Sequence, residues 1–148
     1  MPPTMQPVTP SNVAHLHKWK WARHPDAVYG LWVQTQFVSV VHCFDLKLKR
    51  PDEPTMQVAG LGGITTLANE RGKGYCSLLM EEVAKELSEI ELDGLILNGR
   101  EENAVWASVG FRDIGESHTA PRQRLWYREL RPIDPGHSFT IIPEGFHW

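Results

Sequence analysis

The residue types that could do chemistry are most concentrated in residues 70–79, where the sequence reads Glu-Arg-Gly-Lys-Gly-Tyr-Cys-Ser-Leu-Leu. Two cations, Arg71 and Lys73, alternate there with two glycines, Gly72 and Gly74. Because glycine has no Cβ, an anion can approach the backbone N–H groups of such a turn closely. This pattern favours a binding site for a phosphate or pyrophosphate group.

The segments on either side of this turn predict the geometry that an anion site needs. An apolar, glycine-bearing run at residues 58–66 precedes the turn and predicts a strand. After the turn, four apolar residues recur at helical spacing and are expected on one helix face. They are Leu79, Val83, Leu87 and Ile90. A turn that opens a helix points unpaired N–H groups and the positive end of the helix dipole at one place.

Two widespread phosphate-binding patterns do not fit this run. It lacks both Gly-x-x-x-x-Gly-Lys-Ser/Thr and Gly-x-Gly-x-x-Gly. The run resembles instead the Arg/Gln-x-x-Gly-x-Gly/Ala signature of the GNAT N-acetyltransferase superfamily, although a solvated turn of the same composition is an alternative. In that superfamily the loop holds the pyrophosphate of coenzyme A. The resemblance therefore implies acetyl-CoA as co-substrate, bound by Arg71, Gly72, Lys73, Gly74, Tyr75, Cys76 and Ser77.

A second resemblance to the superfamily lies in residues 103–111, Asn-Ala-Val-Trp-Ala-Ser-Val-Gly-Phe. In the superfamily this motif is a short helix that ends at Gly-Phe before a strand, and Gly110 suits a helix C-cap. By this resemblance Asn103 contacts the cofactor arm. The superfamily has a tyrosine where this sequence has Trp106. That difference favours a second interpretation, a degenerate domain that binds CoA and regulates a partner without catalysis.

Three glycines interrupt the predicted strand at Gly60, Gly62 and Gly63. Glycine in a strand is typical of a bulge or of a close approach by another group, and a bulge that only adjusts twist is one interpretation. In GNAT proteins the corresponding strand bulges, splays from its neighbour and pairs with the pantetheine arm of the cofactor. The resemblance thus implies that the backbone of Ile64, Thr65 and Thr66 binds the cofactor.

The implied reaction transfers an acetyl group to the amine of a small molecule by direct attack in a ternary complex. An ammonium with a reference pKa of about 10.4 must first lose a proton, whereas a thiol of pKa about 8.5 leaves readily as thiolate. A backbone N–H near Ile64 can polarise the thioester carbonyl, and alignment of the two substrates can supply much of the acceleration. No general base can be read from the sequence.

The tail, residues 143–148, ends in two aromatic residues around a histidine. One interpretation is that these aromatics cover an edge of the core. The tail also bears a looser likeness to the aminoglycoside 2′-N-acetyltransferases, whose terminal carboxylate faces the acceptor amine. By that likeness the carboxylate of Trp148 is the candidate catalytic group, with Glu144 and His147 in support. The acidic strand residue of those enzymes has no counterpart at Gly62.

Composition indicates a single domain over residues 1–148. The 148 residues are 41% hydrophobic, which suffices for one core. A net charge of −3 does not favour nucleic acid as a partner. The two cysteines lack metal-ligand spacing and are too few for a disulfide scaffold, so we expect no metal and a cytoplasmic location. No apolar stretch is long enough to span a membrane, so no membrane partner is expected.

The expected fold class is α/β (α+β), a mostly antiparallel sheet with a splayed parallel strand pair flanked by helices. The predicted strands are 29–33, 37–48, 58–66, 95–97, 111–114, 122–130 and 138–142. The strand–helix–strand order around the loop implies the parallel pair. Residues 1–10 resemble a loose arm and residues 11–24 a short helix. The start is short for the superfamily, so its first strand would be missing or supplied by a partner chain, as in a homodimer.

Two interpretations are open for each of three features: the run at residues 19–23, His42 and a set of five arginines. The run Trp-Lys-Trp-Ala-Arg at residues 19–23 suits core-packing tryptophans with solvated cations, or bases stacked on aromatic rings. His42 lies on an apolar strand face, as a hydrogen-bonded core histidine or as a catalytic one. Five arginines are either mostly solvated or form a patch for an anionic substrate. They are Arg112, Arg122, Arg124, Arg128 and Arg131.

Overall fold

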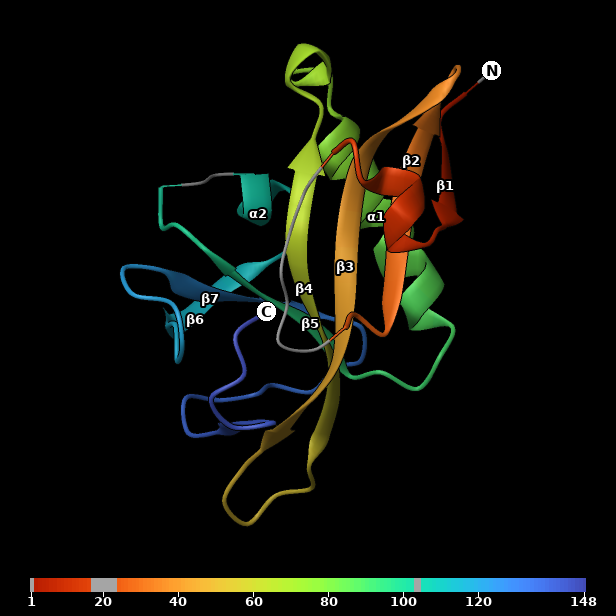
Figure 1. Ribbon diagram of the computed structural model, residues 1–148. Helices are drawn as coiled ribbons and strands as arrows, with labels where there is room; N and C mark the ends of the chain where they lie inside the picture. The colour runs from red at the N-terminus through yellow and green to blue at the C-terminus, as the bar shows by residue number, and fades with distance from the viewer. Residues whose placement is uncertain (1, 17–23, 103–104) are drawn as a thin grey trace.

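The computed structural model describes residues 2–16, 24–102 and 105–148. Its described strands form one eight-stranded sheet in the order β1-β2-β3-β4-β5-β7-β6, with β8 paired to β3 (Figure 1). The strands are β1 Thr4–Pro7, β2 Ala27–Val33, β3 Gln36–Lys49, β4 Met56–Thr66, β5 Gly94–Gly99, β6 Arg112–Glu116, β7 Arg124–Glu129 and β8 Thr140–Ile142. The helical elements are the 3-10 turns η1 Pro10–Val13 and η2 Ala68–Glu70, and the α-helices α1 Tyr75–Ser88 and α2 Val105–Ser108. None of these helices is long and apolar enough to cross a membrane.

The sheet has an apolar layer on each face, which explains why the long strand β3 is buried on both sides over much of its length. Val41 and Cys43 belong to the cluster that α1 covers. Phe44 and Leu46 alternate with them and belong to a second cluster, which the C-terminal segment covers with Trp148. Successive strand residues point to opposite faces, so one strand serves both layers.

The predicted parallel pair is β4 and β5, and α1 makes the crossover between them. The pair runs from Val58 opposite Gly94 to Leu61 opposite Leu97, and there the pairing ends. Both strands continue beyond that point, β4 as far as Thr66. The two strands therefore splay, as predicted, and residues 62–66 have no β5 partner along one edge. The fold is a mixed α/β fold with a mostly antiparallel sheet.

The predicted bulge is present in β4. The β3–β4 ladder shifts register between Val40 and His42, so that Val41 lies opposite two residues of β4, Gly63 and Ile64. Gly63 has φ 58°, a left-handed conformation that favours glycine. The imidazole of His42 covers the Cα of Gly63 and is fully buried. His42 is thus a core residue of the bulge.

One prediction near the N-terminus is wrong, and a second departs from the structure over the residues that are described. Residues 4–7, predicted within a loose arm, form β1, which places Met5 opposite Leu31. The chain itself supplies this first strand because the edge of β2 offers unpaired backbone groups and Met5 packs against the core. Within the predicted helix 11–24, the described residues show only the 3-10 turn η1. The aromatic and basic run at residues 19–23 lies outside the described residues.

The other predicted strands occur within two residues of their expected bounds. Helix α1 buries Leu79, Val83 and Leu87 as predicted. Ile90 departs from that face and is 54% exposed, because the helix ends at Ser88 and Ile90 falls in the turn that follows.

Tyr127 of β7 links two other chain segments through its hydroxyl group. Its side chain is fully buried, and its hydroxyl group lies 3.2 Å from the main-chain oxygen of Asp93 and 3.3 Å from that of Ile133. The Tyr127→Phe variant removes this donor, so we expect the free energy of unfolding to fall by about 1 kcal/mol in urea denaturation.

Tyr29→Phe is the matched control. Tyr29 is also buried, and no hydrogen bond links its hydroxyl group to a described residue. We expect this change to cost less than about 0.5 kcal/mol. Equal losses in the two variants would show that the Tyr127 hydroxyl contributes nothing specific.

Candidate functional site

The turn between η2 and α1 has the backbone geometry predicted for an anion loop. Gly72 and Gly74 have φ values of 80° and 81°, and a Cβ added to either would meet no atom within 4 Å. Gly74 is the N-cap residue of α1, and Leu78 N donates to its carbonyl at 3.0 Å. The N–H groups of residues 75–77 precede this bond and therefore have no acceptor inside the helix. These donors and the positive end of the helix dipole make an anion site.

A pocket of about 220 Å³ lies against this loop. Its lining joins three elements: Thr66 at the end of β4, residues 70–77 of the loop except Lys73, and Val105 at the start of α2. The structure thus brings together most of the residues expected to bind the cofactor. Asn103, the residue expected from the second motif, lies outside the described residues, so its contact stays a prediction.

The two cations of the loop are placed differently. Arg71 lines the pocket, and its Nε donates to the main-chain oxygen of Thr66 at 3.2 Å. Lys73 lies off the pocket lining and pairs its Nζ with Glu70 Oε2 at 2.9 Å. The hydrogen bond to Glu70 raises the pKa of Lys73. Backbone N–H groups and Arg71 therefore carry most of the positive character of the pocket.

Along β4 near the pocket, the backbone N–H and C=O groups of successive residues point alternately toward β3 and away from it, as in any antiparallel pair. Leu67 N donates to Val38 O at 2.9 Å, so the backbone N–H and C=O of Thr66 face away from β3 and toward the splay, where Arg71 Nε donates to the carbonyl. The hydroxyl group of Thr66 faces β3 and lies 2.9 Å from Ser39 Oγ. The carbonyl of Thr65 accepts from Ser39 Oγ at 3.1 Å and so faces β3. Thr66 is therefore well directed for backbone pairing with a cofactor arm, whereas Thr65 is directed away from it.

The second motif forms α2 and the turn that follows. The amide of Phe111 donates to the carbonyl of Trp106 at 3.0 Å, and Gly110 adopts φ 87°, as predicted for a C-cap. The ring of Trp106 is 7% exposed and packs edge-on against Phe111 with ring centroids 6.4 Å apart. Its indole N–H is buried without an acceptor among the described residues.

The interpretation of the five arginines as mostly solvated is wrong for Arg128. Its guanidinium donates to Glu81 Oε1 at 3.0 Å and to Val109 O at 2.8 Å, which joins β7, α1 and the end of α2. Arg124 pairs with Asp113 at 2.9 Å. Such partners come from other elements, so spacing along the chain carried no signal for them.

The C-terminal segment lies on the sheet face opposite α1, at the point where β4 and β5 separate. Trp148 is 4% exposed and packs in the cluster with Phe44. A Cβ added to Gly60 would lie 3.0 Å from the indole Nε1 of Trp148. A Cβ added to Gly62 would lie 2.9 Å from its main-chain carbonyl carbon. The main-chain carbonyl group of Trp148 therefore occupies the space of a side chain at Gly62.

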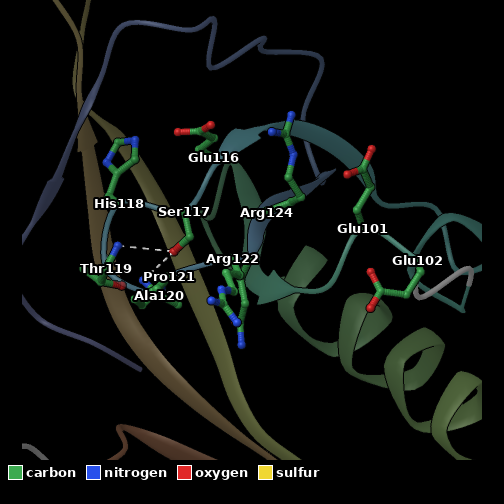
Figure 2. Close-up of a pocket in the computed structure, with 11 residues that line it drawn as sticks. Glu101, Glu102, Glu116, Ser117, His118, Thr119, Ala120, Pro121, Arg122 and Arg124 are labelled. Carbon is green, nitrogen blue, oxygen red and sulfur yellow. Dashed lines mark hydrogen bonds between the residues drawn. The ribbon is translucent and has the colours of Figure 1, made fainter.

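One cavity was not predicted from the sequence, although two of its arginines, Arg122 and Arg124, were named as candidates for an anionic-substrate patch. A cavity of about 510 Å³ lies between the β5–α2 loop and the β6–β7 loop (Figure 2). Glu101 and Glu102 line it from the first loop, and Glu116, Arg122 and Arg124 from the hairpin. No sequence motif marks these positions, because the pairing of β5 with β7 brings the two loops together.

The fold is also found in solved structures of low sequence identity. A conserved protein of unknown function from Enterococcus faecalis is 15% identical with a TM-score of 0.63, over 78% of this chain and 33% of that chain. A GNAT family N-acetyltransferase from Escherichia coli in complex with CoA is 13% identical with a TM-score of 0.67, over 86% of this chain and 81% of that chain. A ribosomal-protein alanine N-acetyltransferase from Escherichia coli is 14% identical with a TM-score of 0.62, over 89% and 96%. This chain thus spans a third of the Enterococcus structure.

No curated protein matches the chain. A family model described as the acetyltransferase (GNAT) domain matches residues 5–100. The matched part is more than half of the 148 residues and contains the splayed strand pair and the loop of residues 71–77. The chain therefore belongs to the GNAT acetyltransferase domain family.

Proposed function

We propose that this chain is an acetyl-CoA-dependent N-acetyltransferase that acts on the amine of a small molecule. The observation that carries the proposal is the convergence of three groups on one pocket. The first N–H groups of α1, the guanidinium of Arg71 and the outward-facing backbone of Thr66 all meet at the end of the splay. Residues 71–77 would hold the pyrophosphate, and β4 would pair with the pantetheine arm.

Acetyl-CoA supplies a thioester. The amine nitrogen forms a bond to the acetyl carbon, the C–S bond breaks, and the proton released by the amine balances the charge of the leaving thiolate. Direct attack by the amine, without a covalent intermediate on a cysteine, is consistent with the pKa shifts of both cysteine thiols. Burial raises the pKa of the Cys43 thiol to about 12 and also raises that of Cys76, so neither is an activated nucleophile.

The carboxyl group of Trp148 is the proposed group that attracts the acceptor. It lies over Gly62, at the first residue of β4 beyond the pairing with β5. A carboxylate there would favour a cationic amine and could help to take its proton. The packing of the indole in the core supports this role, because it holds the carboxyl group in place.

A thiol-release assay with acetyl-CoA and a panel of small amines tests the activity. Release that depends on the amine supports the proposal. Tight binding of acetyl-CoA with no transfer to any amine of the panel would favour the non-catalytic alternative suggested by Trp106.

The Gly74→Val variant tests the loop. A β-branched side chain at φ 81° projects into the open space over the helix start, so we expect the Kd for acetyl-CoA to rise at least tenfold in calorimetry. Gly136→Val is the control, since Gly136 has φ 70° with equally open surroundings but lies outside the pocket. If a folded Gly74→Val protein binds acetyl-CoA with unchanged affinity, the loop is not the binding site of the pyrophosphate.

The Trp106→Phe variant tests whether Trp106 acts as a proton donor to the thiolate. An indole does not titrate near neutral pH, so kcat should stay within about tenfold of the wild-type value, apart from packing losses. A fall of several orders of magnitude, in a variant that melts normally and binds CoA, would give Trp106 a direct part in the reaction.

Replacing the carboxylate of Trp148 by an amide tests the tail, because amidation keeps the indole in its core position. We expect the KM for the amine to rise about tenfold or more, while the KM for acetyl-CoA stays unchanged. Deletion of Trp148 should likewise raise the KM for the amine and leave the KM for acetyl-CoA unchanged, and it should also lower the stability of the protein. If amidation alters neither the amine KM nor kcat, the tail serves packing alone.

A further inference from the structure

The lining of the anion-loop pocket includes a carboxylate, that of Glu70. Among the described residues that line this pocket, only Glu70 and Arg71 carry a charge. A carboxylate repels any anion that enters the pocket, and its charge formally cancels that of Arg71. The side chains of the lining therefore favour a pyrophosphate group only if another cation neutralises Glu70.

Lys73 supplies that cation from outside the lining. Its Nζ lies 2.9 Å from Glu70 Oε2, and this hydrogen bond raises the pKa of Lys73, so the lysine stays protonated. Gly72 and Gly74 have φ values of 80° and 81°, and two left-handed residues around Lys73 turn the chain so that it meets Glu70, three residues earlier. The side chain of Glu70 is 18% exposed and that of Lys73 is 53% exposed. The carboxylate thus belongs to the pocket, and its counter-ion lies in solvent.

Arg71 does not neutralise Glu70. Its Nε donates to the main-chain oxygen of Thr66 at 3.2 Å. The terminal nitrogens of Arg71 have no hydrogen bond or ion pair with a described residue. With Glu70 paired to Lys73, the charge of Arg71 stays available for an anion in the pocket.

We propose that Lys73 is a positioning residue whose side chain neutralises Glu70 instead of contacting the pyrophosphate, and that the pair sets the affinity of the pocket for this group. The inference deepens the proposed function and rests on it. Without the charge of Lys73, Glu70 becomes an uncompensated anion in a pocket of about 220 Å³. Charges interact over roughly 10 Å at 0.1 M salt, which exceeds the width of such a pocket.

Compensating substitutions on the full chain test this role, with the Kd for acetyl-CoA measured by calorimetry. We expect Lys73→Gln to raise the Kd about threefold or more and Glu70→Gln to lower it by a similar factor. The double variant should lie within about twofold of the wild-type Kd, because the two removed charges cancel. Lys73→Arg keeps the charge and should also stay within about twofold. If Lys73 contacts the pyrophosphate itself, the double variant stays as weak as Lys73→Gln.

Acetyl-pantetheine, which lacks the pyrophosphate, separates charge from loop shape. Its Kd should be the same in all these variants, and an equal loss of affinity for both ligands would show that the pair only holds the loop. Glu82 and Lys85 of α1 are the matched control. They form a pair of the same spacing, with Lys85 Nζ 3.4 Å from Glu82 Oε1, and line no part of this pocket. Lys85→Gln and Glu82→Gln should leave the Kd for acetyl-CoA unchanged.

Inorganic pyrophosphate is the probe that distinguishes this inference from the proposed function. The same compensation with pyrophosphate, in a chain that transfers acetyl groups to no amine, would confirm the pair and overturn the reaction. Acetyl transfer in a protein whose Lys73→Gln variant binds acetyl-CoA as tightly as the wild type would overturn the role of Lys73 alone. A chain that binds neither acetyl-CoA nor pyrophosphate would overturn both.

Discussion

The end of the pairing between β4 and β5 is the constraint on which the rest of the structure depends. Backbone groups of a sheet need partners, and these two strands give each other none beyond Leu61 and Leu97. The bulge at Gly63 lies at this point, where a bulge bends the strand and increases its twist. The anion loop begins just past the end of β4, and the tail and the β6–β7 loop both contact the start of the opening.

Two cavities of the described structure differ in the groups that line them. The N-terminus of α1 and the end of β4 form one pocket, rich in backbone donors. Side chains of both charges line a separate cavity between Glu101 and Glu102 on one side and the β6–β7 loop on the other. Backbone donors suit a group that every turnover shares, because they depend little on side-chain identity.

The role of a cationic side chain in this protein cannot be read from its neighbours in the sequence. Lys73 lies in the anion loop yet pairs with Glu70, and Arg128 is half-buried as a clamp between α1 and α2. Arg122 has no such partner among the described residues. A cationic side chain therefore serves as a neighbour's counter-ion, as a structural clamp or as an exposed charge without a partner in the described residues, depending on what the fold brings within about 4 Å.

The sequence by itself determined the features that depend on neighbours within a few residues. Alternation predicted the strands of the meander, helical spacing predicted α1, and the glycines predicted the tight turn at Gly72 and Gly74 and a bulge in β4. Only the tertiary structure decided β1, which has no strong pattern of its own and forms because β2 offers an open edge. It also decided the placement of Trp148 over Gly62 and the joining of Glu102 with Arg122 in one cavity. Those contacts depend on strand order and register, which long-range packing sets and local spacing does not encode.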